Sequence, residues 1–172
     1  MNLFKAGKFA LIAHGNQKRK YTGEPYINHC VEVAGIVASV TKDEDVIIAA
    51  ILHDTVEDTK VEFEDIHREF GGKVVLLVEE VTDVSKPEDG NRKVRKEIDR
   101  IHLSKASPDG KTIKLADLIN NTETITKYDE NFAKTYMKEK KELLKVLVEG
   151  NSELWLRAKK IVDDYYLTHE EE

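Results

Sequence analysis

The sequence predicts an all-helical protein, and three observations support this prediction. Apolar residues recur at spacings of three and four along most of the 172 residues, which is the period of an α helix. Alternation with a period of two over the length of a strand is hard to find. Charged residues make up 35% of the chain and apolar residues 40%, with three prolines and nine glycines. This composition is typical of a helical globular protein.

The length and charge limit the classes of protein that the chain can represent. A chain of 172 residues suggests one domain with one core. Its net charge of −6 argues against a general nucleic-acid binder, because such proteins gain affinity by neutralising phosphates. Cys30 is the only cysteine, which excludes an internal disulfide and a thiolate zinc cluster. Charges interrupt every hydrophobic run, so we expect no signal peptide, no membrane span and a cytoplasmic location.

Two helix starts and one interruption organise the first third of the chain. A helix over residues 2–14 is interrupted by the glycines and the basic cluster of residues 15–25. Asn28 stands where a helix N-cap belongs, in a helix expected to end near residue 41, and Asp43 can cap the next one. The first helix is expected to turn four residues toward the core: Leu3, Phe4, Ala10 and Leu11.

Turn signals divide the rest of the chain into further helical segments. Gly71-Gly72 closes a short helix over residues 62–70, and a markedly apolar helix follows over residues 74–84. Pro87–Gly90 and Ser107–Gly110 are expected to be turns. The remaining helices are expected over residues 92–104, 111–126, 131–149 and 152–167. No internal repeat or linker divides the chain, so we predict a single bundle.

The strongest chemical signal is the run from His53 to Asp58, His-Asp-Thr-Val-Glu-Asp. It follows an apolar helix that should be buried, where charged groups without a partner are costly. If the helix continues, His53 lies over Glu57 and Asp54 over Asp58, and if it stops, both acids remain within about one turn. Imidazole and carboxylate together suit manganese, iron, zinc or cobalt. An acidic run after a helix is most often a solvated loop, so the metal hypothesis depends on further ligands.

Two more candidate ligands lie far from this run in the sequence. His29 opens the helix that follows Pro25, and Asp117 lies within the apolar helical run of residues 113–119. A carboxylate in such a run needs a partner. A buried hydrogen bond, or exposure on the helix surface, would satisfy it as well as a metal ion would.

Several phrases of the sequence resemble the HD superfamily, and within it the hydrolase domain of RelA/SpoT proteins and the stand-alone small alarmone hydrolases. They occur in the family's order over about residues 6–125. The matching phrases are residues 14–20, 22–29 (Thr-Gly-Glu-Pro-Tyr-Ile-Asn-His), 49–58, 70–71, 78–83 and 114–117 (Lys-Leu-Ala-Asp). The resemblance implies an HD-type helical bundle over residues 1–172, with one divalent metal, usually manganese. The implied ligands are His29, His53, Asp54 and Asp117.

The resemblance also implies a reaction. The family removes pyrophosphate from the 3′ position of guanosine tetra- or pentaphosphate, and the positions of its water-activating pair match Glu57 and Asp58. The physical logic agrees, because a metal lowers the pKa of water while nearby carboxylates orient the water and accept its proton. Two acids beside a metal site repel, which raises the proton affinity of one of them. Support of the metal ligands is the alternative role of this pair.

Four further residues match the family's contacts to the nucleotide substrate. The resemblance places Arg19 and Lys20 on the phosphates of the nucleotide. The guanidinium of arginine can donate two hydrogen bonds to a phosphate, and the ammonium of lysine adds a positive charge. It places Asn121 and Thr124, four and seven residues after Asp117, around the nucleoside.

Three departures from the family pattern leave the substrate open. One extra residue, about Tyr21, follows the basic pair, and Leu118 and Glu123 stand where the family commonly has polar or basic residues. The alternatives to an alarmone hydrolase are an HD phosphohydrolase of another nucleotide, such as NADPH or a nucleoside phosphate, and a non-catalytic nucleotide sensor. The intact Glu57 and Asp58 argue against the sensor. The helices over about residues 128–167 either complete the bundle or provide a surface for a homo-oligomer.

Overall fold

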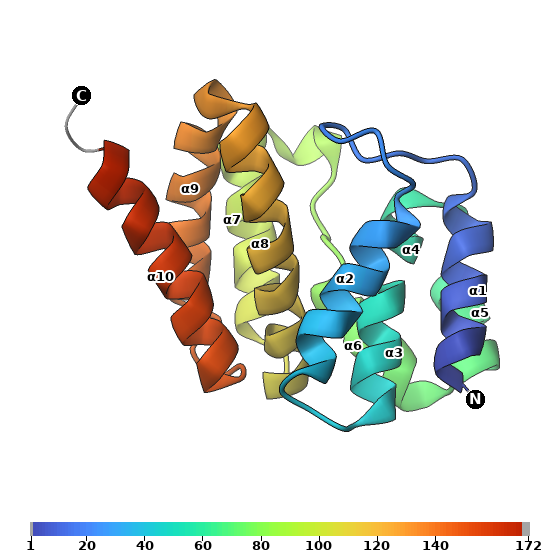
Figure 1. Ribbon diagram of the computed structural model, residues 1–172. Coiled ribbons are helices and arrows are strands. Elements are labelled where there is room, and N and C mark those ends of the chain that lie inside the picture. The colour runs from blue at the N-terminus through green and yellow to red at the C-terminus, as the bar shows by residue number, and fades with distance from the viewer. Residues whose placement is uncertain (1, 170–172) are drawn as a thin grey trace.

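The computed structural model describes residues 2–169, and within this range the chain forms helices and no strand (Figure 1). The prediction of an all-helical fold is confirmed. In chain order the elements are α1 (Asn2–His14), α2 (Ile27–Ala38), α3 (Glu44–Leu52), α4 (Thr55–Asp58), α5 (Phe63–Phe70), α6 (Gly72–Val81), the 3-10 helix η1 (Pro87–Asp89), α7 (Arg92–Ser104), α8 (Pro108–Tyr128), α9 (Glu130–Leu144) and α10 (Ser152–His169). None of the described helices is long and apolar enough to cross a membrane.

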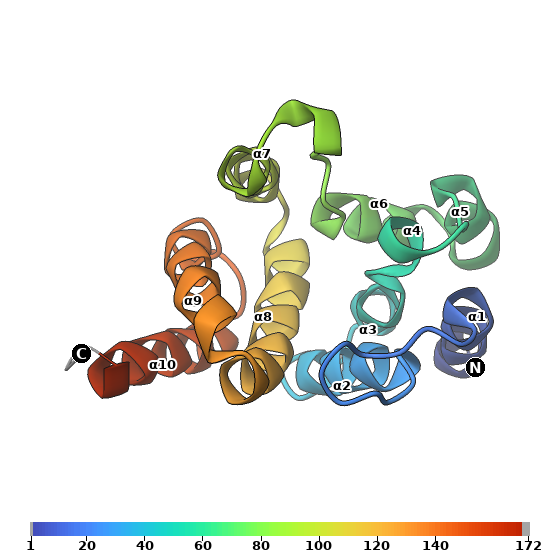
Figure 2. The same cartoon turned by 90° about the horizontal axis from the view of Figure 1, so that it is seen from above.

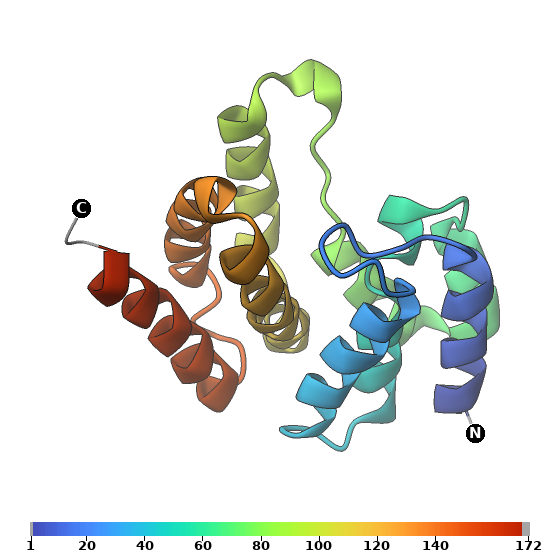
Figure 3. The same ribbon diagram turned by 45° about the horizontal axis from the view of Figure 1, so that its top comes forward.

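Helix α8 connects the two sides of the molecule. Viewed from above, it lies between the group formed by α1–α6 and the helices α7, α9 and α10 (Figure 2), and the view turned by 45° shows the same arrangement (Figure 3). It packs against α2 and α6 on one side and against α9 and α10 on the other. Side chains at the middle of α8 therefore face helices from both parts of the chain.

Helix α3 is the centre of the N-terminal group. The Asp43 side chain caps it by accepting a hydrogen bond from the backbone N–H of Asp45 at 3.1 Å, as predicted. Every residue from Ile48 to Leu52 is buried, and α1, α2 and α6 pack around the helix. A helix that is apolar on all sides belongs in a core. The chain then leaves this core at His53, which places the chemical run at the end of a buried helix.

The core face of α1 differs from the prediction. Ala6 and Ala10 are fully buried, whereas Leu3, Phe4 and Leu11 are 38%, 83% and 50% exposed. The expectation for Ala10 is confirmed, and the expectation for Leu3, Phe4 and Leu11 is wrong. The two alanines lie four residues apart on one face, and their small side chains let α1 pack closely against α3. The larger residues are on the faces left outside this contact.

Three helix boundaries also differ from the prediction. Helix α2 begins at Ile27, so Asn28 lies inside the helix and does not cap it. Ser107 is the N-cap of α8, and its hydroxyl accepts a hydrogen bond from the Gly110 N–H at 3.1 Å. The predicted turn over 107–110 is therefore the first turn of that helix. Helix α9 ends at Leu144, whose carbonyl accepts a hydrogen bond from Trp155 Nε1 at 3.1 Å.

Gly150 lies in a close contact between the loop after α9 and helix α8, which gives a test of the packing. A Cβ atom there would lie 2.8 Å from Leu115 Cδ1, 3.1 Å from the Lys111 carbonyl carbon and 3.2 Å from the Leu147 oxygen. Two of these atoms belong to the backbone and cannot move cheaply, so Gly150→Ala should lower the free energy of unfolding by about 1–3 kcal/mol.

Gly35→Ala is the matched control for this substitution. Gly35 lies within α2, and a Cβ atom there would meet nothing within 4 Å. The variant's free energy of unfolding should therefore rise by about 0.5–1 kcal/mol, because alanine favours a helix more than glycine does. Urea denaturation of the two variants and the parent chain measures both changes. Equal stability of Gly150→Ala and the parent chain would contradict the described packing.

Candidate metal centre

The four predicted ligands meet in one cluster, although they are up to 88 residues apart in the sequence. His53 Nε2 lies 3.0 Å from Asp54 Oδ2, and His29 Nε2 lies 3.4 Å from the same oxygen. Asp117 Oδ1 lies 3.4 Å from His29 Nε2 and 3.8 Å from His53 Nε2. The donor atoms of His29, His53 and Asp54 all lie within 4.8 Å of one another, as the ligands of a single ion must.

Three helices hold this cluster together. His29 is in the first turn of α2, and Asp117 is near the middle of α8. His53 and Asp54 occupy the turn between α3 and α4, so of the two alternatives the one in which the helix stops is correct. Because α3 ends at Leu52, the adjacent His53 and Asp54 can both face the same point. The helix contacts of α2 and α3 with α8 complete the cluster.

Hydrogen bonds on the far side of each imidazole fix its orientation. Asn120 Oδ1 accepts a hydrogen bond from Arg19 Nη1 at 2.7 Å, so this atom is the amide oxygen, and it also lies 2.7 Å from His29 Nδ1. His53 Nδ1 lies 2.9 Å from the Ala50 carbonyl oxygen. Both oxygens can only accept, so both Nδ1 atoms carry a hydrogen. In its neutral form each ring then directs the lone pair of its Nε2 atom into the cluster, as a metal ligand requires.

The electrostatics of the cluster favour a bound cation. Burial lowers the pKa of His53, but the carboxylates of Asp54 and Asp117 outweigh it and raise this pKa to about 10. Burial alone would raise the pKa of the Asp54 and Asp117 carboxyls. The two histidines, and for Asp117 also Lys114, outweigh burial and hold both pKa values well below their usual range. The carboxylates are thus charged, and their negative charge attracts a cation to the two Nε2 atoms, either a proton or a metal ion.

The buried nitrogen atoms test whether the residues present fit a metal ion. In the part of the chain that the structure describes, His29 Nε2 and His53 Nε2 are buried and have no hydrogen-bond partner. A buried polar atom without a partner is costly. Two imidazole nitrogens and two carboxylates that converge on one point are a donor set for a divalent transition metal. The residues therefore fit the metal that the sequence predicted.

The two predicted catalytic acids extend from the short helix α4 beside the cluster. Glu57 Oε2 accepts a hydrogen bond from the backbone N–H of Asp83 at 3.2 Å. Partial burial and the Asp83 carboxylate raise the pKa of Glu57 to about 7, against the opposing effect of Lys114. A carboxyl group with this pKa can hold or release a proton near neutral pH.

A chain of hydrogen bonds that the sequence did not reveal orients Asp58. Gln17 Nε2 donates to Asp58 Oδ2 at 2.9 Å, which leaves Gln17 Oε1 as an acceptor 2.8 Å from His14 Nδ1. His14 Nε2 can then accept from the Cys30 thiol, whose sulfur lies 3.6 Å away. The buried His14 thus holds Gln17, and Gln17 holds the carboxylate of Asp58. The only hint of this contact in the sequence was the presence of Gln17 in a matching phrase.

The predicted substrate-binding residues divide into two groups. Arg19 is buried, and its Nη2 atom lies 3.2 Å from both Asn121 Oδ1 and Thr124 Oγ1 of α8. Asn121 in turn donates to Asp117 Oδ1 at 2.5 Å. These three residues therefore lie together beside the metal ligands. Lys20 is exposed and points toward Tyr21, 3.1 Å from its hydroxyl, outside this group.

The two departures in α8 do not face the cluster. Leu118 is buried in the core. Glu123 lies on the outer side of α8, where one of its oxygens is 3.9 Å from Arg157 Nη2 of α10. Neither residue makes a recorded contact with the metal ligands, so the cluster itself matches the family pattern.

Comparisons with known proteins agree with this geometry. A model of the HD domain matches residues 6–147. The guanosine-3′,5′-bis(diphosphate) 3′-pyrophosphohydrolase of Aquifex aeolicus (strain VF5) is 39% identical over 139 residues, which are 81% of this chain and 20% of that protein. This chain thus spans about a fifth of that relative's length. The guanosine-3′,5′-bis(diphosphate) 3′-pyrophosphohydrolase MESH1 of Mus musculus is 35% identical over 174 residues, with 96% of each chain covered.

A solved structure is similar over nearly its whole length. It is that of "a metazoan ortholog of SpoT", a protein that "hydrolyzes ppGpp and plays a role in starvation responses". Its TM-score to this chain is 0.86 at 31% sequence identity, with 95% of this chain and 94% of that chain covered.

Asn120 provides a test of the cluster that leaves all four predicted ligands in place. Because its side chain holds the His29 ring, Asn120→Ala should weaken the affinity for a divalent metal by about 10- to 100-fold. Titration calorimetry with manganese measures the change. Asn131→Ala, at an exposed position of α9, is the matched control and should leave the affinity unchanged. An unaltered affinity of the Asn120 variant would contradict the role of this contact in orienting His29 as a ligand.

Proposed function

Because the chain belongs to the HD domain family, we propose that it is a metal-dependent phosphohydrolase that acts on guanosine 3′,5′-bis(diphosphate) and releases pyrophosphate from its 3′ position. One observation carries this proposal: the four-ligand cluster lies directly beside a pair of acids, Glu57 and Asp58. The activity for which the Aquifex and mouse relatives are named supports this substrate. We further propose that residues 1–172 form one domain, in which residues 128–167 complete the bundle.

We propose manganese as the metal, held by His29, His53, Asp54 and Asp117. The mixture of imidazole and carboxylate donors supports a borderline divalent ion. Such an ion would polarise a phosphoryl oxygen and make bound water more acidic. The protein itself would hold the donor set in place, through Asn120 on one imidazole and Tyr26, whose hydroxyl donates to Asp54 Oδ2 at 2.6 Å.

The two acids of α4 have different surroundings, and these suggest different roles. Glu57, with its pKa raised to about 7, would accept a proton from the attacking water near neutral pH. Asp58, fixed by Gln17, would orient that water. Lys114 lies 3.4 Å from Asp117 Oδ2 and is available to stabilise negative charge that develops on the phosphoryl oxygens. Glu57 would thus remove the proton, and Lys114 would stabilise the charge that develops.

The nucleoside would bind against the face of α8 that carries Asn121 and Thr124. Arg19 already contacts both residues, so its guanidinium would shape this face and direct its remaining donors to the nucleotide. Lys20, which is exposed, would reach the phosphates as a mobile cation. The position of Glu123 beside Arg157 removes the acid that argued against an alarmone from this face.

The substrate proposal is tested with a panel of nucleotides and manganese. We expect release of pyrophosphate from guanosine 3′,5′-bis(diphosphate), with a kcat/KM at least tenfold above those for NADPH and for nucleoside monophosphates. Faster turnover of one of the latter would reassign the enzyme to that substrate. Tight binding of the alarmone without any turnover would instead support the sensor alternative.

The catalytic pair is tested with Glu57→Gln and Asp58→Asn, which remove charge at nearly constant size. The double variant should lose about 10²- to 10⁴-fold in kcat, because general-base assistance contributes about that much. Manganese affinity should stay within a few fold of the parent chain, since neither residue is among the four ligands. Glu64→Gln, at an exposed position of α5, is the matched control. Unchanged turnover of the double variant would refute the assigned mechanism.

A further inference from the structure

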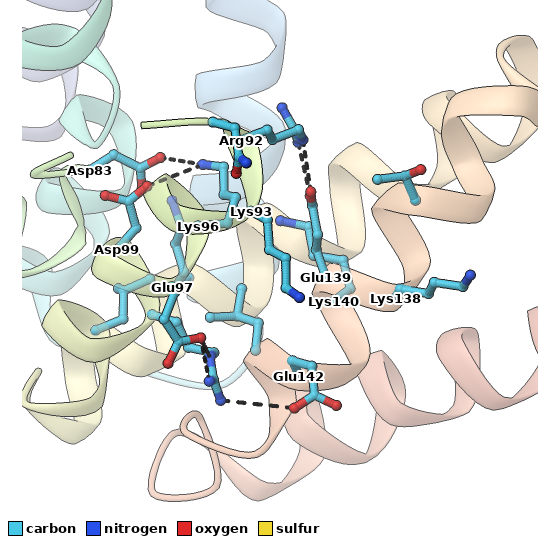
Figure 4. Close-up of a pocket in the computed structure, with 16 residues that line it drawn as sticks. Asp83, Arg92, Lys93, Lys96, Glu97, Asp99, Lys138, Glu139, Lys140 and Glu142 are labelled. Carbon is cyan, nitrogen blue, oxygen red and sulfur yellow. Dashed lines mark hydrogen bonds and ion pairs between the residues drawn. The ribbon is translucent and has the colours of Figure 1, made fainter. Parts of the chain in front are cut away.

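A second feature beside the metal centre is a cavity of about 610 Å³ between α7 and α9 (Figure 4). Seven of its lining side chains are lysine or arginine and five are carboxylates. The chain as a whole has the opposite balance, with a net charge of −6. We call this cavity the α7–α9 cleft. The cations on which the argument depends are Arg92, Lys96, Lys114 and Lys140.

Most of the cleft's acids are already paired with cations at its rim. Lys96 Nζ lies 2.6 Å from Asp83 Oδ2, and Arg92 forms a two-pronged contact with Glu139 at 2.7 and 2.9 Å (Figure 4). The first pair joins α7 to the segment after α6, and the second joins α7 to α9. They fix the positions of the cleft's walls and leave other cations without a counter-charge.

Lys140 is such a cation. It lies half-buried on the inner side of α9, with its Nζ atom 4.6 Å from the centre of the Tyr136 ring. Within residues 2–169 it makes no ion pair and no side-chain hydrogen bond. Burial, reinforced by Lys114 and Lys96 against the nearby aspartates, lowers the pKa of Lys140 to about 8. The cleft thus has positive charge that the protein itself does not neutralise, which is a property of anion sites.

Two residues join the cleft to the metal centre. Lys114 lines the cleft and lies 3.4 Å from Asp117 Oδ2, a predicted metal ligand. Asp83 also lines the cleft, and its backbone N–H donates to Glu57. A molecule whose reacting group lies at the metal centre would therefore have the α7–α9 cleft as its immediate neighbour. The ligand of the cleft should be anionic and part of, or adjacent to, that molecule.

We propose that the α7–α9 cleft binds the phosphate groups of the substrate that do not react, with Lys140 as the cation that contacts them. For the substrate proposed above these groups are the 5′-diphosphate of the nucleotide. The inference rests on the proposed function for the identity of the nucleotide, and on the cleft alone for the chemistry of the ligand. Specificity would then come from a second phosphate group that must be present at a fixed distance from the first.

Lys140→Met tests this proposal, because it removes the charge and keeps the length of the side chain. The manganese-loaded variant should show a KM for guanosine 3′,5′-bis(diphosphate) that is about tenfold or more above that of the parent chain. Its KM for guanosine 3′-diphosphate, which lacks the 5′ phosphates, should not change. Lys140→Arg should restore the first KM. Lys134→Met, at an exposed position of the same helix, is the matched control.

A binding measurement separates this proposal from the proposed function. Guanosine 5′-diphosphate carries the remote group without the reacting one, and we expect Lys140→Met to weaken its binding to the manganese-loaded protein by a similar factor in titration calorimetry. If the parent chain hydrolyses no alarmone but this difference remains, the proposed function fails and the cleft assignment stands. If the alarmone is hydrolysed and Lys140→Met raises both KM values equally or neither, the cleft assignment is overturned. The assignment would also be overturned if guanosine 5′-diphosphate bound in a way that depends on Lys140 but did not inhibit hydrolysis of the alarmone competitively. The cleft would then bind a separate effector.

Discussion

The structure depends on one electrostatic constraint, the burial of two carboxylates against two imidazoles at the meeting point of α2, α3 and α8. Asp54 and Asp117 remain charged there, and each histidine presents an Nε2 atom that has no hydrogen-bond partner in the described chain. Charges removed from water require compensation at close range. A divalent cation would supply it for all four groups at once, whereas a proton can serve only one nitrogen at a time. The fold and the proposed metal would then depend on each other, because the helix packing brings the donors together and the cation would offset the cost of their burial.

The packing of the helices explains how donors so far apart in sequence reach one point. Helix α3 is buried from Ile48 to its end at Leu52, so the next two residues emerge together at the edge of the core. Helix α8 passes this edge and carries both Asp117 and Asn120, three residues apart and thus on neighbouring parts of one face. Asn120 accepts hydrogen bonds from His29 and from the buried Arg19. One hydrogen-bonded assembly in this way joins two predicted ligands, His29 and Asp117, to three of the four residues predicted to meet the nucleotide, which are Arg19, Asn121 and Thr124.

The sequence was sufficient to predict features that depend on neighbouring residues, such as the bounds of a helix. It was also sufficient to propose candidate ligands where a residue type is chemically unusual in its position. Helix α7 follows its predicted bounds because Asn91 and the turn before it mark its start. The four proposed ligands could be named because the ordered phrases matched a family, since a histidine and an acid after an apolar run most often belong to a solvated loop. Residues that act through contacts distant in sequence could not be found. Gln17 meets Asp58 across 41 positions, and nothing in the order of residues distinguishes Asn120, which faces His29, from the adjacent Asn121, which faces Asp117.

The distribution of charge suggests why an acidic protein can bind a polyanion. The acids of the cluster would be neutralised by the metal and by Lys114, which serves both the cluster and the α7–α9 cleft. Most of the remaining carboxylates of the cleft are paired with Lys96, Arg92 and Arg100. The charge of the cleft that remains unpaired is positive and belongs to Lys140 and its neighbours. The electric field at a bound substrate therefore depends on these unpaired groups and not on the net charge of −6. A nucleotide with two phosphorylated positions fits this division, since one anion would meet the metal and the other would meet lysine. A nucleotide with one such position would leave half of the site's positive charge without a partner.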